Sequence, residues 1–100
     1  MRICIPVKEI NGLSSRVAKK LKNAKAFSII DLDDNNNVED IRFIENNIDK
    51  EDIIPLLASY AVDMFVVNEI GKEDEDQILD MGIDLVKDAY GRIERILQQL

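Results

Sequence analysis

The sequence predicts a three-layer α/β/α domain in which a mixed five-stranded sheet has helices on both faces. Two observations predict this class: short apolar runs alternate with amphipathic segments, and residues 26–45 have the pattern of a β-hairpin. Apolar residues make up 46% and charged residues 33% of the chain, a balance typical of a folded globular protein. A length of 100 residues fits one hydrophobic domain, so we expect a single domain over residues 1–100.

The first strand and the segment after it occupy the opening quarter of the chain. Residues 3–7 are a continuous apolar run, which is typical of a strand buried on both faces. The pair Asn11-Gly12 indicates a turn, and Ser14 or Ser15 is expected to cap a short helix after it. The apolar side of this helix would carry Val17, Leu21 and Ala24.

A hairpin and a second helix are expected next. Residues 26–33 and 38–45 contain β-branched and aromatic side chains and indicate two antiparallel strands joined by an Asn-rich turn. Asp49 or Asp52 is expected to start the following helix. Pro55 would then fall in the first turn, where a missing amide hydrogen costs little.

The second half of the chain alternates strand and helix. Residues 62–67 and 83–86 are short apolar runs that indicate strands. Residues 71–81 indicate a helix with an acidic first turn, which suits the positive end of the helix dipole. Residues 93–100 place apolar side chains at helical spacing and indicate a terminal helix.

These elements predict the topology of the sheet and the position of a binding site. Right-handed crossovers give the strand order 3-2-1-4-5, with the second strand antiparallel to the others. In such sheets, ligands bind beyond the carboxyl ends of the parallel strands, at the point where the strand order reverses. That point lies between the first and fourth strands, so residues 8–14 and 68–72 are expected to border the site.

The charge and composition of the chain exclude several classes of function. A net charge of −7 disfavours binding to nucleic acid or to anionic membranes. Because the chain has no histidine and one cysteine, it lacks Ser-His and Cys-His catalysis, histidine metal sites and an intramolecular disulfide. The first strand also has no carboxylate for a two-metal nuclease site, so we expect a protein that is not an enzyme. No apolar run reaches the roughly 18 residues of a membrane span, and a cytoplasmic location is expected.

A basic segment in this acidic chain is the candidate binding surface. Five of the 13 positive charges fall within residues 16–25, and three of them would share one face of the predicted short helix. Cations beside free backbone amides suit an anionic ligand, such as a metal–sulfur cluster, a phosphate or a carboxylate. The alternative is a solvated helix face without a ligand. The complete candidate site consists of Asn11, Gly12, Arg16, Lys19, Lys20 and Gly71.

Several segments follow one another in an order known from one family: RICIPV, IRFIEN, YAVDMFVV, NEIG and MGIDLV. Within and after them, the matching positions are Pro6, Glu45, Asn46, Gly71, Gly82, Gly91 and Glu94. In this order the chain resembles the NifX-like family of dinitrogenase iron-molybdenum cofactor biosynthesis proteins, which includes the carboxyl-terminal domain of NifB. The resemblance covers roughly residues 1–98 and implies a ribonuclease-H-like fold. It also implies a non-catalytic domain that binds or carries the cofactor or its iron-sulfur precursor.

Two segments depart from the family pattern and leave two hypotheses open. Residues 21–23 are Leu-Lys-Asn where the family commonly has Phe-Gly-Arg, and residues 46–50 lack its His-Gly element. The first hypothesis is a carrier or chaperone for an anionic iron-sulfur or iron-molybdenum-type cluster, which works with cofactor-assembly proteins. The second is a protein-interaction or regulatory module without metal. Cys4 is a candidate cluster ligand, but its position in an apolar strand favours a core residue.

Overall fold

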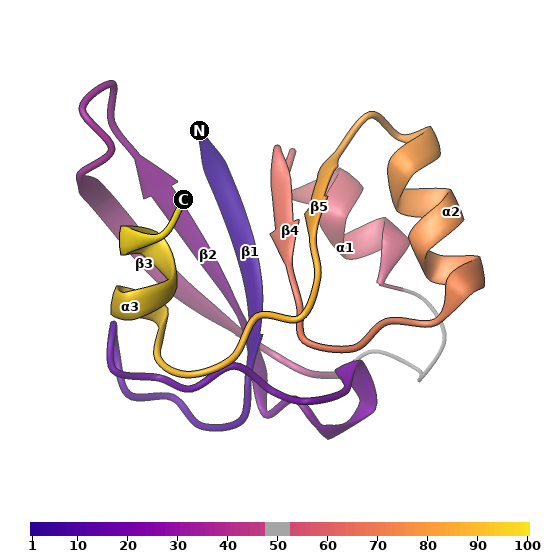
Figure 1. The fold of residues 1–100 in the computed structure, drawn as a ribbon, viewed down its shortest axis with the longest axis horizontal. Coiled ribbons are helices and arrows are strands. Elements are labelled where there is room, and N and C mark those ends of the chain that lie inside the picture. The colour runs from indigo at the N-terminus through magenta and orange to yellow at the C-terminus, as the bar shows by residue number, and fades with distance from the viewer. Residues whose placement is uncertain (48–52) are drawn as a thin grey trace.

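A mixed five-stranded sheet forms the centre of the computed structural model, which describes residues 1–47 and 53–100 (Figure 1). Its strands are β1 (Arg2–Val7), β2 (Ala26–Leu32), β3 (Val38–Glu45), β4 (Met64–Val66) and β5 (Asp84–Val86). The helices are α1 (Ile54–Ser59), α2 (Lys72–Asp80) and α3 (Ile93–Gln98), and a single 3-10 turn, η1, covers Leu21–Asn23.

The order of the strands is β3-β2-β1-β4-β5, which confirms the predicted topology. β2 pairs antiparallel with both β1 and β3, whereas β4 pairs parallel with β1 and with β5. The central position of β1 follows from its composition, because a strand that is apolar on both faces is stable only between two covered layers. The carboxyl ends of β1, β4 and β5 therefore meet at one edge of the sheet, which we call the carboxyl edge.

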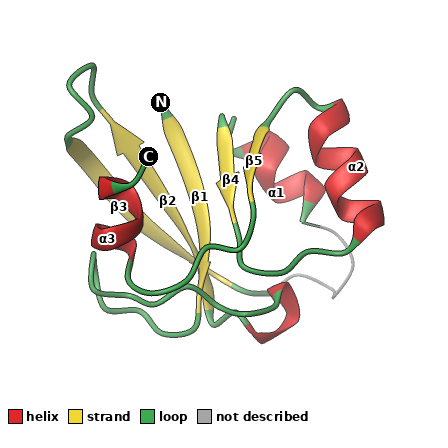
Figure 2. Ribbon diagram, viewed as in Figure 1, coloured by secondary structure: helices red, strands yellow, loops and turns green. Residues whose placement is uncertain are grey.

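Two hydrophobic cores lie on opposite faces of the sheet. Side chains alternate along β1, so that Cys4 packs in one core and Ile3 and Ile5 pack in the other. Leu57 of α1 and Ile78 of α2 are fully buried against the Cys4 face, and α2 lies beside β5 (Figure 2). The core on the opposite face is closed by α3 through Ile93 and Ile96.

The predicted short helix after Ser14 or Ser15 is wrong. The chain is extended there instead, because its backbone is bonded to neighbours that are distant in sequence: the Lys8 amide donates to the Arg16 carbonyl (3.0 Å) and the Ala18 amide to the Pro6 carbonyl (2.9 Å). Val17 and Ala18 are buried in opposite cores, as in a strand. These contacts stabilise the extended backbone more than a short isolated helix would be stabilised by its own hydrogen bonds.

The other elements lie close to their predicted bounds. The second hairpin strand covers the predicted residues 38–45, and β4 is shorter than the predicted 62–67. Asp49 and Asp52, the two residues expected to start the next helix, lie outside the described residues. The described part of that helix begins at Ile54, and Pro55 lies in its first turn, as expected. None of the helices in the described ranges has the length and apolar character to cross a membrane.

Candidate functional site

A pocket of about 380 Å³ opens at the carboxyl edge of the sheet. Three loops line it, and each follows a parallel strand: Lys8 follows β1, Asn68 follows β4, and Tyr90 follows β5. The extended segment after β1 completes the wall. We call this the carboxyl-edge pocket, and its lining residues are Lys8, Arg16, Val17, Lys19, Asn68, Tyr90 and Gly91. It lies beside the reversal of strand order, where ligands bind in sheets of this kind.

The loops around this pocket are joined to one another by hydrogen bonds. The Asn68 side-chain amide donates to the Ala89 carbonyl at 2.8 Å, and the Ala89 amide donates to the Val67 carbonyl at 3.0 Å. These bonds fix the loop after β4 to the loop after β5. The Val17 amide donates to the Gly91 carbonyl at 2.9 Å and fixes the segment after β1 to the same loop. The walls of the pocket are thus built in advance of any ligand.

Three cationic side chains line the pocket, and two of them have carboxylate partners. Glu9 receives hydrogen bonds from the Arg16 guanidinium at 3.0 and 3.4 Å and from the Arg16 amide at 3.0 Å. The guanidinium contact holds the pKa of Glu9 below its usual value. Lys19 lies 3.7 Å from a carboxylate oxygen of Glu69. In the part of the chain that the structure describes, no carboxylate lies within 4.0 Å of the Lys8 ammonium.

Three of the residues that line the pocket also have unbonded backbone amides within the described ranges. The amides of Lys19, Tyr90 and Gly91 donate no hydrogen bond to any residue in the described ranges. Gly91 has a φ of +92°, which a residue with a side chain rarely adopts. Free amides next to cationic side chains form the kind of concave surface that holds anions in proteins.

The structure divides the six predicted site residues among three places. Arg16 and Lys19 line the carboxyl-edge pocket. Lys20 and Gly71 line a separate pocket of about 310 Å³ between η1 and the start of α2. The backbone of Lys20 is extended (φ −130°, ψ 150°), and neighbouring side chains on such a backbone point in different directions, which separates Lys19 from Lys20.

Asn11 and Gly12 line neither of these two pockets. Their turn is closed on itself: the Asn11 amide donates to the Ser15 hydroxyl, and this hydroxyl donates to the Gly12 carbonyl, both at 2.7 Å. The Asn11 amide therefore has a partner within its own turn and is not free for a ligand.

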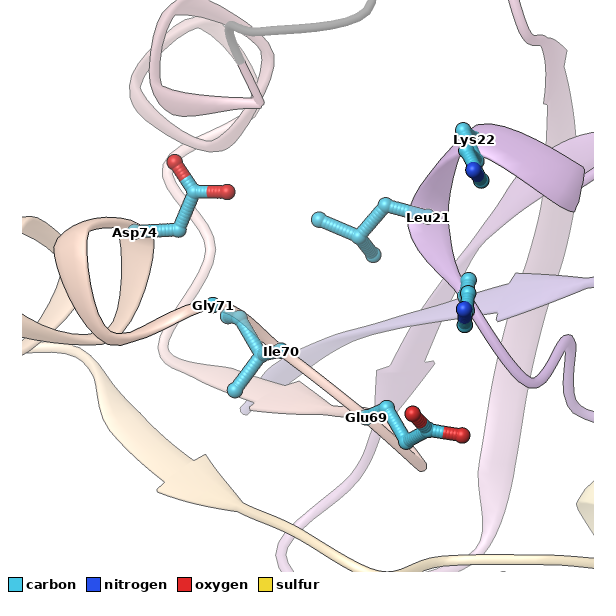
Figure 3. Close-up of a pocket in the computed structure, with 7 residues that line it drawn as sticks. Leu21, Lys22, Glu69, Ile70, Gly71 and Asp74 are labelled. Atoms are coloured by element: carbon cyan, nitrogen blue, oxygen red, sulfur yellow. The ribbon is translucent and has the colours of Figure 1, made fainter.

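The pocket between η1 and α2 has both signs of charge. Leu21 points from η1 toward the start of α2, and the Asp74 carboxylate points back toward η1 (Figure 3). Glu69 adds a second carboxylate to a lining that also includes Lys20 and Lys22. Two carboxylates on the wall repel a multiply charged anion, so the carboxyl-edge pocket is the better anion site of the two.

Five of the pocket residues were not among the predicted site residues: Lys8, Val17, Asn68, Tyr90 and Gly91. Lys8 and Asn68 fall within the segments expected to border the site. Lys8 is the first residue after β1, and Asn68 is the second residue after β4. Tyr90 and Gly91 lie after β5, outside the two segments that were expected to border the site. The signal that identifies them is a glycine between the last strand and the last helix, where a loop must turn sharply.

Cys4 is a core residue and does not reach the carboxyl-edge pocket. Its side chain is fully buried in the centre of β1, and this burial raises the pKa of the thiol. Within the described ranges, no group of three or more histidine, cysteine, aspartate or glutamate side chains is arranged to hold a metal ion. The pocket offers cations and amides to an anion rather than ligands to a bare metal.

The fold is thus an α/β domain with a cationic pocket beyond the carboxyl ends of its parallel strands. The sequence model of the dinitrogenase iron-molybdenum cofactor family matches residues 1–100, so the chain belongs to this family. This match confirms the family resemblance found in the sequence. A comparison with curated protein sequences gives no match.

Several solved structures have the same fold at low sequence identity. The crystal structure of PH0822 is 22% identical with a TM-score of 0.86, and the match covers 98% of this chain and 87% of that protein. The NMR structure of TM1290 from Thermotoga, described as a candidate NifB protein of the DUF35 family, is 20% identical with a TM-score of 0.75 and coverages of 97% and 84%. The apo form of the orange protein from Desulfovibrio gigas is 15% identical with a TM-score of 0.78 and coverages of 98% and 84%.

Proposed function

We propose that the protein is a non-catalytic carrier or chaperone that holds an anionic metal–sulfur cluster in the carboxyl-edge pocket during iron-molybdenum cofactor assembly. The family supports a role in the assembly or binding of this cofactor. The observation that carries the proposal is the convergence of Lys8, Arg16 and Lys19 on one pocket in a protein with a net charge of −7. Proteins that hand over cargo of this kind work with cofactor-assembly proteins, and we expect the partners to be of that class.

The chemistry of the pocket fits a polyanion held without covalent bonds. Lys8 offers a full positive charge, while Arg16 and Lys19 offer charges that Glu9 and Glu69 partly neutralise. Sulfide or oxide groups at the surface of a cluster accept hydrogen bonds from ammonium groups and from backbone amides. Such binding is reversible, which a carrier requires, whereas several thiolate ligands would hold the cluster firmly.

Anaerobic reconstitution with ferrous iron and sulfide tests the proposal. After desalting, the wild-type protein should retain iron and show visible absorption. The double variant Lys8→Ala/Lys19→Ala should retain at most about a tenth as much, because two charge-assisted contacts are lost. The matched control is Lys22→Ala/Lys25→Ala, which removes the same charge outside the pocket and should behave as the wild type.

Two results would overturn the proposal. One is a folded wild-type protein that stays colourless and free of iron after reconstitution, as the alternative of an interaction module without metal requires. The other is an equal loss of iron in both double variants, which would mean that overall charge rather than the pocket governs binding.

A further inference from the structure

β3 is the outer strand of the sheet, and its outward edge is unpaired in the part of the chain that the structure describes. The Asn46 amide donates to the Lys25 carbonyl at 3.2 Å, and this pair continues the β2–β3 register, in which Arg42 lies opposite Ile29. Because hydrogen-bonding direction alternates along a strand, Arg42 bonds inward to β2 while Ile41 and Phe43 direct their amides and carbonyls outward.

An edge strand of eight residues is long enough to pair with another strand, and proteins usually protect such an edge. The β2–β3 pairing has a register shift between Asp31 and Leu32, which affects only the beginning of β3. The pairing of residues 40–45 with β2 is regular. The side chains on this regular stretch are a mixture of charged and apolar residues, with both signs of charge. Whether a second strand can pair with this edge therefore depends on which charges the pairing register places opposite each other.

A second copy of the same edge can pair antiparallel with β3 about a two-fold axis at any residue of the strand, and the four registers centred on residues 40–43 bring the charges of Asp40 and Arg42 nearest to the axis. The registers centred on Asp40 and on Arg42 place two identical charges opposite each other, which is destabilising. The register centred on Phe43 brings no opposite charges together. In the register centred on Ile41, Asp40 of each copy lies opposite Arg42 of the other.

The register centred on Ile41 also brings the opposite charges close together. Ile41 faces its own copy as a hydrogen-bonded pair, since its backbone groups point outward. Asp40 and Arg42 then face each other as non-hydrogen-bonded pairs, in which side chains approach most closely. Within one chain, Arg42 already lies 3.4 Å from Asp40 and 5.9 Å from the ring centroid of Tyr60, so both charged groups are held on one face of the sheet. Two copies would form a closed ring of four alternating charges.

We propose that β3 is a self-association edge, at which two copies pair antiparallel about Ile41 and join their sheets into one of ten strands. The interface is isologous, so it closes as a dimer and does not continue into a fibre. Pairing of single strands buries less surface than a standard interface of about 1,600 Å², so we expect a dissociation constant on the order of 0.1 mM. This inference is independent of the cluster, because β3 contributes no residue to the carboxyl-edge pocket.

Charge reversal tests the register. Sedimentation equilibrium of the wild-type protein up to about 1 mM should show a mass that rises toward that of the dimer. Asp40→Arg leaves two arginines on the edge and Arg42→Asp leaves two aspartates, so each variant alone should be monomeric. An equimolar mixture of these two variants restores both opposite-charge pairs and should form the heterodimer with at least wild-type affinity. Asp34→Arg, in the turn before β3, is the matched control and should dimerise as the wild type does.

The mixture makes the test independent of folding defects, because a variant that failed to fold could not be rescued by its counterpart. Circular dichroism of each variant alone checks the fold directly. A wild-type protein that remains monomeric at about 1 mM would overturn the proposal. So would a dimer that persists in both single variants, because its interface would then lie elsewhere.

Discussion

The backbone amide of Val17 donates a 2.9 Å hydrogen bond to the carbonyl of Gly91, and this bond joins the segment after β1 to the loop after β5. The two residues are far apart in sequence but line the same pocket. Gly91 makes this bond with a φ of +92°. The shape of the pocket thus depends on a conformation that glycine adopts without strain.

Gly91→Ala should therefore weaken both the fold and the pocket. A side chain at this φ costs about 1–2 kcal/mol, which urea denaturation would measure, and iron retention after reconstitution should fall with it. Gly82→Ala is the matched control, because Gly82 has a φ of +79° but lies at the end of α2, away from the pocket. It should lose similar stability and keep its iron. Equal iron retention in the two variants would show that the Gly91 loop does not shape the site.

The pair of Arg2 and Asp31 should make stability depend on pH. The Arg2 guanidinium lies 2.8 Å from the Asp31 carboxylate, and this hydrogen bond holds the pKa of Asp31 below its usual value of 3.8. A carboxylate with a lowered pKa in the folded state stabilises the fold above its unfolded pKa, and this stability is lost as pH falls through the folded pKa. Asp31→Asn should thus lower the urea midpoint at pH 7, and the difference from the wild type should shrink below about pH 4. An equal difference at pH 7 and at pH 2.5 would contradict this assignment, and Asp34→Asn is the exposed control.

Cys4 should be inert in the folded protein. Its thiol is fully buried and its pKa is raised, so the reactive thiolate is absent at neutral pH. We expect iodoacetamide to alkylate it only after denaturation, as mass spectrometry would show. Cys4→Ala should cost about 1 kcal/mol of stability through the small cavity it leaves, with no loss of reconstituted iron. Rapid alkylation of the native protein, or loss of iron in the variant, would return Cys4 to the list of cluster ligands.

Tyr90 should report on the occupancy of the pocket. The chain has no tryptophan and two tyrosines, and Tyr90 lines the pocket with 80% of its surface exposed. Tyr60 lies at the opposite end of β1, where its carbonyl accepts a hydrogen bond of 2.7 Å from Arg2. Reconstitution should therefore quench most of the tyrosine fluorescence of the Tyr60→Phe variant and little of that of Tyr90→Phe. Stronger quenching in the Tyr90→Phe protein would place the cluster elsewhere.

The strands and their order were predictable because they depend on local composition. The apolar run at residues 3–7 requires cover on both faces, and the hairpin at residues 26–45 pairs neighbours in the chain. The extended segment at residues 15–18 was predicted wrongly as part of a short helix. Its backbone is held extended by hydrogen bonds to Pro6 and Gly91, and helical periodicity does not take such distant partners into account.

The sequence predicted which edge of the sheet carries the candidate site, but it did not predict all of the residues that line the pocket there. The rule that ligands bind beyond the carboxyl ends of parallel strands predicted a site bordered by residues 8–14 and 68–72, and Lys8 and Asn68 of these segments line a pocket in the structure. The assignment of Lys20 to the same surface as Lys19 depended on the helix that does not form, and the two line different pockets. Tyr90 joins the site through the pairing of β4 with β5, a long-range contact.

The two halves of the sheet differ in length, since β2 and β3 have seven and eight residues whereas β4 and β5 have three each. Fewer backbone bonds have to break to detach the short pair than the long one. Amide protons of β4 and β5 should accordingly exchange with deuterated solvent through a partial opening that leaves the hairpin closed. Two of the three loops around the carboxyl-edge pocket follow these short strands, so the same partial opening would separate two walls of the pocket while the hairpin stays folded.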